Sequence, residues 1–458
     1  MRNLIIDYMN VFLVNPCSFE EKVASIPLSL LSLYSVLENA GIDVKILNNF
    51  NHKDLIKILN NNDIDLFGIT ASTGIGLNPA LKVSEIAKKL NIKIFWGGPH
   101  ATVLPEQTLQ NPNIDGVVIG EGEKTILDLV KNLNSLENVK GIMFKKAKKI
   151  IKCPPQQLIK NLDSLPFPAW NLIKRFPRSP LLYNQKCCYM ETSRGCPFNC
   201  GFCFCQFGKK WRCKSIKRVM KEIDYIESRG ISSISFVDDN FLLSKKRVVK
   251  LCKSIIRDKK DIQWAIRGAR VDEVDRELIQ WMKKAGCVYM GFGVESGSER
   301  ILDMMNKNIS VQQTKKAFSL CHEADILTGA FMMANLPGET KEDFNQTIKL
   351  IHDIQPSVLM LQCFTPYPGT KLYKIALQYG FKEPRSIEEW EKIDADPLSL
   401  KFSEIDSSTL KIAKRLVSYN SSKTLFEEWK NKKGIIEALK LAFTTKYYKF
   451  FKETYTQK

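Results

Sequence analysis

The sequence of 458 residues contains no uninterrupted apolar run that reaches the roughly 18 residues of a membrane span. Its apolar start, MRNLIIDYMNVFLV, is interrupted by Asp7 and Asn10, and no small-residue cleavage site follows, so we predict a buried strand and no signal peptide. Internal repeats, low-complexity segments and arginine-rich tracts are also missing. These absences exclude a membrane-spanning or repeat protein and favour a cytoplasmic one.

The charge and the cysteine content are less ordinary. A net charge of +19 and a pI near 9.2 favour an anionic partner, such as nucleic acid, a phospholipid surface, or an acidic peptide or cofactor. The alternative is a solvated, lysine-rich surface. Thirteen cysteines without an export signal indicate a reducing compartment, where clustered thiols bind metal or do chemistry more often than they form disulfides.

The first part of the chain alternates short apolar runs with helix-period segments, from VFLVN at Val11 to KTILDLVKNL ending at Leu133. Five strands, each followed by a helix, predict an α/β, flavodoxin-like (Rossmann-like) doubly wound domain with a parallel sheet over residues 1–135. Ligands bind such sheets beyond the carboxyl ends of the strands. The unusual residues lie there: Ser72, Thr73 and Gly74; Gly97, Gly98, Pro99 and His100; and Glu121, Gly122 and Glu123.

A proline-punctuated stretch then predicts a linker over residues 136–182. Six further strand and helix units, over residues 183–373, are too few for an eight-unit barrel and predict a partial (β/α)6 TIM-type barrel with its site at the carboxyl ends of the strands. Residues 374–458 form a mainly helical C-terminal region that ends in a basic amphipathic helix pattern. This helix either packs on its own protein or lies on an anionic membrane surface.

Three cysteines occur together in the turn sequence ETSRGCPFNCGFCF, at Cys196, Cys200 and Cys203. A zinc site normally takes four ligands in two separated pairs, and Cys205 and Cys213 are the residues that would complete such a set. A cubane iron-sulfur cluster held by only three cysteines instead leaves one iron open to a substrate. The spacing alone leaves both interpretations open.

The spacing Cys-x3-Cys-x2-Cys, with Phe202 before the third cysteine, resembles the signature of radical S-adenosylmethionine (SAM) enzymes. Further motifs resemble that family in order and spacing, so the resemblance covers nearly the whole chain: FVDDNF, RGARVD, GFGVESGSERIL, NLPGET and FTPYPGTKLY. It implies that the three cysteines ligate a 4Fe-4S cluster, whose open iron binds SAM and whose electron cleaves SAM to a 5'-deoxyadenosyl radical.

The resemblance also implies roles for single residues. Asp238 and Asp239 should lie near the methionyl amino group of SAM, Glu295 and Ser296 should reach the ribose or amino end, and Arg270 is a candidate for the carboxylate. Each role suits the charge of its partner. For Asp238, Asp239 and Arg270 the alternative is a strand-end salt bridge.

The amino-terminal motifs VNP, GGPHATVLPE and GVVIGEGE resemble the cobalamin-binding domain of one radical SAM subfamily, the class B methyltransferase-like enzymes. The resemblance implies cobalamin contacts from Asn15, Ser72, Thr73, Gly97, Gly98, His100, Glu121 and Gly122. The Asp-x-His-x-x-Gly motif that supplies a cobalt ligand in the methionine synthase type is missing, so we expect His100 either to line the corrin or its tail or to be a structural histidine. Only Cys17 precedes residue 150, which excludes a methylthiolating enzyme with a second cluster.

These parts imply a cobalamin-dependent radical SAM methyltransferase that methylates an unactivated carbon, using the deoxyadenosyl radical and methylcobalamin. An oxidative cyclase with the same cofactors is the first alternative, and a non-enzymatic cobalamin or redox sensor is the second. The expected partners are a small-molecule, lipid or peptide substrate and an electron donor such as flavodoxin or ferredoxin. We expect peripheral membrane contact only through the C-terminal helix, and no nucleic acid.

Overall fold

The structure is a computed structural model that describes residues 9–19, 26–74, 76–147, 149–182, 185–395 and 399–411. The described residues divide into two compact units, which we treat separately. Unit 1 holds residues 9–177, 206–213 and 383–395, and unit 2 holds residues 178–205, 214–382 and 399–411.

Unit 1 is built on a seven-stranded sheet in the order β2-β1-β3-β4-β5-β6-β7. The first five strands pair in parallel, whereas β5, β6 and β7 pair antiparallel. The strands are β1 (Asn10–Val14), β2 (Asp43–Leu47), β3 (Leu66–Thr70), β4 (Ile94–Gly97), β5 (Gly116–Val118), β6 (Ile142–Lys146) and β7 (Lys149–Lys152). The doubly wound domain is confirmed, and a lysine-rich hairpin extends its sheet beyond the five predicted strands.

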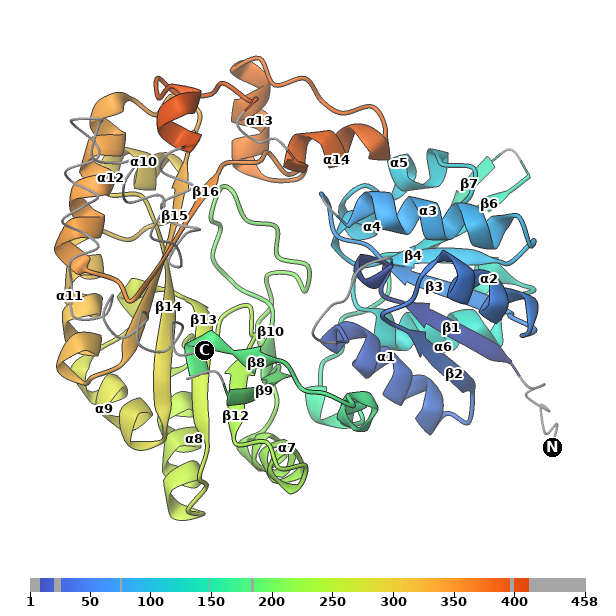
Figure 1. Cartoon of the computed structure of the whole chain (residues 1–458), viewed down its shortest axis with the longest axis horizontal. Helices are drawn as coiled ribbons and strands as arrows, with labels where there is room; N and C mark the ends of the chain where they lie inside the picture. Colours follow the sequence, from blue (N-terminus) through green and yellow to red (C-terminus); the bar gives the residue numbers. More distant parts are fainter. Residues whose placement is uncertain are drawn as a thin grey trace. The chain divides into compact units, whose positions relative to one another are not determined.

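Helices cover both faces of this sheet (Figure 1). They are α1 (Leu28–Asn39), α2 (His52–Asn60), α3 (Leu77–Lys88), α4 (Pro99–Val103), α5 (Pro105–Gln110), α6 (Gly122–Lys131) and α14 (Ile387–Ala395). Helices α1 and α6 pack on each other, and α14 packs on α3. The interior strand β1 is apolar on both of its faces, as expected for a strand buried between two helix layers.

Unit 2 contains a second seven-stranded sheet, in the linear order β16-β15-β14-β13-β12-β9-β8. Only the edge strand β8 pairs antiparallel; the other six strands are parallel, as predicted for a partial barrel. The strands are β8 (Arg178–Ser179), β9 (Gln185–Met190), β12 (Ser233–Phe236), β13 (Gln263–Ala269), β14 (Cys287–Glu295), β15 (Leu327–Ala334) and β16 (Val358–Cys363). Two short strands, β10 (Ser193–Arg194) of unit 2 and β11 (Arg212–Cys213) of unit 1, lie outside both large sheets.

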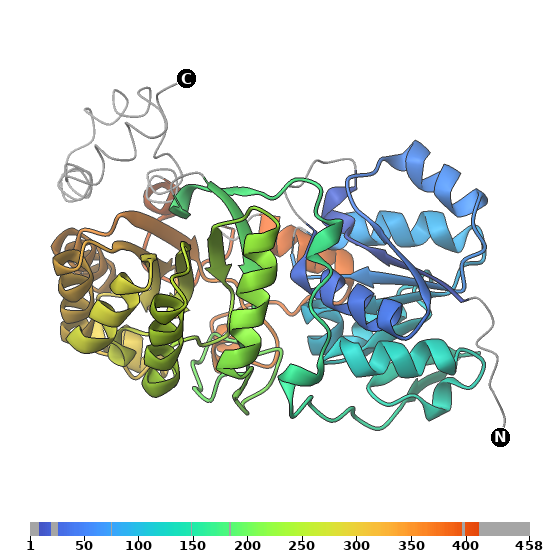
Figure 2. The ribbon, with the colours of Figure 1, turned by 90° about the horizontal axis from the view of Figure 1, so that it is seen from below.

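Five of the seven described helices of unit 2 form a row along the outer face of its sheet (Figures 1 and 2), in the order α7 (Ile216–Ser228), α8 (Lys245–Arg257), α9 (Arg276–Lys284), α11 (Val311–Glu323) and α12 (Lys341–Ile354). Two short helices, α10 (Glu299–Met304) and α13 (Lys371–Gln378), complete the set of seven. Each begins after a serine, threonine or aspartate whose side chain accepts a backbone N–H of the first turn. Such caps contribute about 1 kcal/mol each and fix where each loop at the carboxyl side of the sheet ends.

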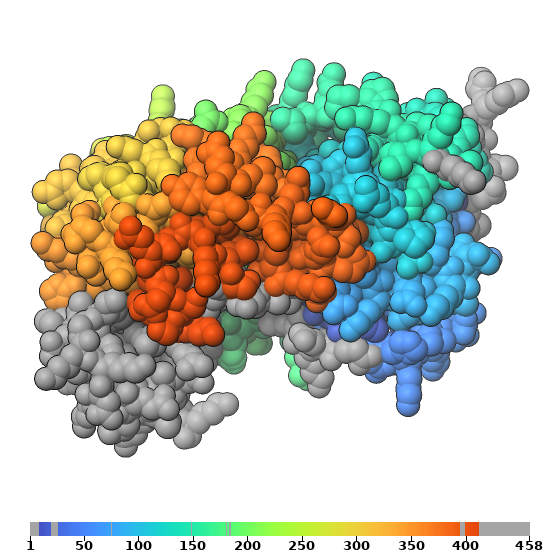
Figure 3. Space-filling model, turned by 90° about the horizontal axis from the view of Figure 1, so that it is seen from above, coloured from blue at the N-terminus to red at the C-terminus, as the bar shows by residue number. Residues whose placement is uncertain are grey.

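Residues 399–411 lie on the surface of unit 2, in red in Figure 3, against the loop that follows β15. Gly338 donates to the carbonyl of Phe402 at 2.9 Å, and Glu404 donates to the carbonyl of Glu339 at 3.0 Å.

Of the helices in the described residues, none combines the length and the apolar sequence that a membrane span needs. The predicted basic amphipathic helix near the carboxyl terminus lies outside the described residues.

Candidate functional site

The three predicted cluster ligands lie on the loop that leaves β9, the first parallel strand of the unit 2 sheet. Cys196 and Cys200 are half-buried, and Cys203 is exposed. The loop is fixed near its middle, where Gly201 donates to the carbonyl of Met305 at 2.6 Å and accepts from Leu372 at 2.7 Å. A Cβ at Gly201 would lie 3.1 Å from that Met305 oxygen, so glycine permits this close approach.

The arrangement differs from that of a single-ion site. In the part of the chain that the structure describes, no three histidine, cysteine, aspartate or glutamate side chains converge on one point. Cysteines that hold a cubane cluster each bind a different iron and need not converge. Cys205 lies beside Asp239, with 3.6 Å between Sγ and Oδ2, and burial, with the Asp239 charge, raises the pKa of its thiol to about 12. This arrangement is compatible with a cubane cluster, and its binding by Cys196, Cys200 and Cys203 stays a prediction.

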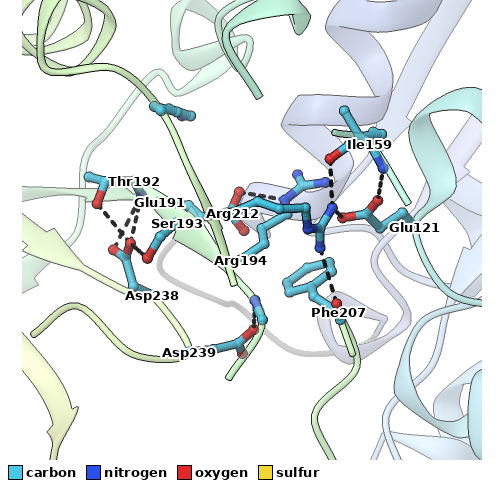
Figure 4. A network of polar contacts seen from close by, with 12 residues as sticks. Glu121, Ile159, Glu191, Thr192, Ser193, Arg194, Phe207, Arg212, Asp238 and Asp239 are labelled. Carbon is cyan, nitrogen blue, oxygen red and sulfur yellow. Dashed lines mark hydrogen bonds and ion pairs between the residues drawn. The ribbon is translucent and has the colours of Figure 1, made fainter. Parts of the chain in front are cut away.

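The two aspartates that follow β12 hold the start of the cysteine loop (Figure 4). Asp238 is buried and accepts hydrogen bonds from the backbone and hydroxyl of Thr192, at 3.1 and 2.7 Å, and from the Ser193 hydroxyl at 2.6 Å. Burial raises the pKa of Asp238 against these hydrogen bonds. Asp239 accepts from the backbone N–H of Gly195 at 2.7 Å. Both carboxylates orient the loop, and their contact with SAM stays a prediction.

Arg270 lies at the carboxyl end of β13, against the cysteine loop. Its guanidinium pairs with Asp272 through two contacts of 2.9 Å, which is the strand-end salt bridge named above as the alternative. The same guanidinium lies 3.8 Å from the Phe198 ring centroid, and its Nη1 is 3.9 Å from Cys200 Sγ. The Arg270 side chain is thus both paired with Asp272 and close to Cys200, one of the predicted cluster ligands.

Glu295 ends β14 in a left-handed conformation, with φ of 67°, that is unusual for a residue with a side chain. Its carboxylate pairs with Lys307 at 2.9 Å, and both side chains are buried. A Cβ at Gly293 would lie within 3 Å of both charged groups, so that glycine makes room for the pair. Ser296 is also buried, with its hydroxyl 3.1 Å from that of Thr347. Sequence reasoning missed Lys307, whose only signal is its position in an Asn-Lys-Asn turn.

The residues predicted to contact cobalamin follow four neighbouring strands of unit 1, in the order β1-β3-β4-β5. They therefore share one edge of the sheet. Asn15, after β1, is buried and donates to Asn48 Oδ1 at 2.8 Å. Ser72 and Thr73 follow β3, Gly97 and Gly98 end β4, and His100 lies in α4.

His100 is fully buried, and its Nδ1 is 3.2 Å from the hydroxyl of Thr73. Its Nε2 is buried and has no hydrogen-bond partner among the described residues. Burial lowers the pKa of His100 to about 4, so the imidazole is neutral. Gly98 has φ of 94°, and a Cβ there would meet the Ala71 carbonyl at 2.8 Å. An unpaired polar atom and a glycine-lined edge fit a large ligand that carries amide groups, as the corrin does.

Glu121 is engaged within unit 1 by a residue that sequence reasoning missed (Figure 4). Its carboxylate accepts from Arg212 Nη1 at 2.7 Å and from the backbone of Ile159 at 2.7 Å. Arg212 also donates to the carbonyls of Ile159 and Phe207. The side chains of Glu121 and Arg212 are only 3% and 4% exposed, so the pair is a buried anchor for residues 206–213. Gly122 is the first residue of α6, and a Cβ added at this position would lie 3.0 Å from the side chain of Leu33.

The fold and these sites define a class of protein, a radical SAM enzyme with an amino-terminal cobalamin-binding domain. Residues 190–351 match the Radical SAM superfamily, and residues 22–130 match the B12 binding domain. An uncharacterized methyltransferase of Pyrococcus horikoshii is 36% identical over 366 residues, which cover 77% of this chain and 78% of that protein.

Two further comparisons extend this result. An anaerobic magnesium-protoporphyrin IX monomethyl ester cyclase of Cereibacter sphaeroides is 31% identical, over 70% of this chain and 55% of that protein. A solved structure of the radical SAM methyltransferase TsrM of Kitasatospora setae, with cobalamin and a 4Fe-4S cluster bound, has the same fold. Its TM-score is 0.69 at 19% identity, over 81% of this chain and 78% of that one.

The chain belongs to the family of cobalamin-dependent, methyltransferase-like radical SAM enzymes. The family membership and the fold predicted from the sequence are confirmed. The predicted cofactors, a 4Fe-4S cluster, SAM and cobalamin, are those of this family.

Proposed function

We propose that this protein is a radical SAM C-methyltransferase that methylates an unactivated carbon of its substrate. One observation carries the proposal. A three-cysteine loop at the carboxyl end of a half-barrel occurs in one chain with a cobalamin-binding domain. The Pyrococcus horikoshii relative, which is named a methyltransferase, supports methyl transfer over other radical reactions.

When bound, the cluster and SAM supply a radical that removes hydrogen from carbon, and cobalamin supplies a methyl carrier. The residues of unit 2 would bind and orient these groups. Cys196, Cys200 and Cys203 would hold the cluster, Arg270 would bind the carboxylate of SAM, and Ser296 and Glu295 its ribose or amino end. Asp238 and Asp239 keep the cysteine loop in place through Thr192, Ser193 and Gly195.

The residues of unit 1 would hold cobalamin by shape and by neutral hydrogen-bonding groups. Gly97 and Gly98 permit a close approach of the ligand to the backbone. Thr73 fixes the ring of His100 through Nδ1, which leaves Nε2 for a polar group of the ligand. The neutral imidazole neither adds nor removes a charge at this edge of the sheet.

The second candidate is an oxidative cyclase, which the relative from Cereibacter sphaeroides favours. It would use the same cofactors and the same two sites. A small molecule, lipid or peptide is the proposed substrate, and a low-potential donor of the flavodoxin or ferredoxin class would supply the electron. The basic carboxyl-terminal segment is proposed to contact an anionic membrane surface.

The products formed from SAM distinguish these candidates. The reconstituted, reduced protein is incubated anaerobically with SAM and a cell extract that contains the substrate. A methyltransferase forms S-adenosylhomocysteine in step with 5'-deoxyadenosine, because one SAM gives up its methyl group and another is cleaved. 5'-Deoxyadenosine without S-adenosylhomocysteine would indicate the cyclase, and neither product from an intact cluster would indicate a sensor.

A further inference from the structure

Two cations lie on the aromatic residues of the cysteine loop, on either side of Cys200 in the sequence. The guanidinium of Arg270 lies over the ring of Phe198, and the ammonium of Lys307 lies 5.4 Å from the centroid of Phe202. Phe198 separates Cys196 from Cys200, and Phe202 separates Cys200 from Cys203. Both cations are therefore held beside the segment that carries the proposed cluster ligands.

Lys307 is a buried cation with a fixed position. It is 6% exposed and pairs with Glu295, whose carboxylate is 2.9 Å away. Burial lowers the pKa of Lys307, but the charges of Glu295 and Cys200 outweigh it and raise that pKa overall. The lysine is therefore protonated, and its ammonium lies beside Phe202, the residue directly before Cys203.

The turn that carries Lys307 is bound to the cysteine loop. Asn306 and Asn308 on either side have left-handed backbones, with φ of 50° and 52°. Asn306 donates from Nδ2 to the carbonyl of Asn199 at 2.7 Å, and Met305 accepts from Gly201. These hydrogen bonds hold Lys307 at a fixed distance from the cysteine loop, so that its charge can act on the loop through space.

We propose that Lys307 sets the reduction potential of the cluster bound by Cys196, Cys200 and Cys203. Reduction moves one electron from a reduced flavodoxin-type or ferredoxin-type donor to the cluster, and no proton or bond changes. A fixed cation in a poorly solvated site lowers the energy of that added negative charge. Glu295 holds Lys307 in place and offsets part of its field. This inference rests on the proposed function, since it requires the cluster.

The test is a redox titration of the full-length, reconstituted protein, followed by the electron paramagnetic resonance signal of the reduced cluster. We expect Lys307→Met to disfavour reduction about tenfold, which is 59 mV more negative for a one-electron couple. Lys307→Arg should restore a potential close to that of the wild type. The control is Lys315→Met, which removes a partly exposed lysine that pairs with Asp353 in the same unit and should leave the potential unchanged.

Glu295→Gln gives an independent reading with the opposite sign, because it removes the anion and keeps the cation. Its potential should rise, and the double variant should return toward the wild type. If the Lys307→Met protein binds no cluster, the Glu295→Gln protein provides the test. An unchanged or lowered reduction potential of Glu295→Gln would then overturn the inference. A Lys307→Met protein with full iron content and the wild-type potential does the same. Failure of the wild type to take up a cluster would instead contradict the proposed function.

Discussion

The two candidate cofactor sites differ in charge. In unit 2, charged groups surround the cysteine loop and are paired with each other: Arg270 with Asp272, and Lys307 with Glu295. In unit 1, the corresponding sheet edge presents hydroxyls, glycines and a neutral imidazole, and the carboxylate of Glu121 is bound by Arg212. The site in unit 2 therefore suits small charged ligands, such as a cluster and a zwitterionic amino acid. The site in unit 1 suits a large neutral ring that is recognised by its shape.

The largest expected effect comes from removing one thiol of the cysteine loop. Cys200→Ala should abolish the broad iron-sulfur absorption and all cleavage of SAM, because two cysteines do not hold a cubane cluster that leaves one iron open. The matched control is Cys205→Ala, which removes a neighbouring thiol that lies beside Asp239. Retention of absorption and SAM cleavage by Cys200→Ala, or their loss in Cys205→Ala, would contradict the ligand assignment.

The second prediction tests whether Glu121 is an anchor and not a ligand contact. Glu121→Ala leaves the buried guanidinium of Arg212 without its anion, which should cost about 3–5 kcal/mol in the free energy of unfolding. Urea unfolding measures this loss, and hydrogen exchange should rise in residues 206–213. Glu85→Ala, which breaks the exposed pair with Lys89, is the control and should leave the free energy of unfolding close to that of the wild type. Equal effects of both variants would refute the anchor.

The neutral imidazole of unit 1 predicts a particular pH dependence. The pKa of His100 falls from 6.5 to about 4 on folding, so the unfolded chain binds the proton more tightly. The stabilisation from a neutral His100 is complete above pH 6.5 and is lost as the pH falls toward 4, by about 3 kcal/mol. Urea midpoints measured across this range should show the loss in the wild type, and His100→Gln should remove that part of it. Identical pH profiles for the two proteins would contradict a buried neutral His100.

The smallest expected effects come from two glycine substitutions at the end of β4, which distinguish a loss of space for the ligand from backbone strain. Gly98→Ala should cost about 1–3 kcal/mol, because φ of 94° with ψ of −171° is a conformation essentially confined to glycine, and the new Cβ would also meet the Ala71 carbonyl at 2.8 Å. Gly97→Ala meets only Val118 Cβ, at 3.9 Å, and should keep its stability. We expect Gly97→Ala to lower cobalamin affinity in equilibrium dialysis with hydroxocobalamin. Unchanged affinity would remove Gly97 from the proposed contacts.

The sequence predicted those parts of the fold and sites that depend on local pattern. The strand and helix alternation placed Ser72 and Gly97 at the ends of parallel strands, and Cys196 in the loop after another, because each follows an apolar run. It missed the hairpin of β6 and β7, because the apolar runs of these strands, IMF in one and II in the other, are only three and two residues long and are followed by lysines.

Partners distant in the sequence could not be predicted. Glu121 looks available for a ligand until the fold brings Arg212, 91 residues later, onto its carboxylate. Likewise, the run Asp238-Asp239 does not show that Thr192 and Ser193 use the hydrogen-bonding capacity of Asp238. Lys307 was missed because its role depends on a contact with Phe202, more than a hundred residues earlier.

The central claim is that one chain holds both cofactors, and counting them tests it most directly. The full-length protein is purified anaerobically, reconstituted with iron, sulfide and hydroxocobalamin, and freed of unbound ligand before iron and cobalamin are quantified. We expect about one cobalamin per chain together with the four irons of one cubane cluster. A complete cluster without retained cobalamin would contradict the account and would remove the basis for methyl transfer.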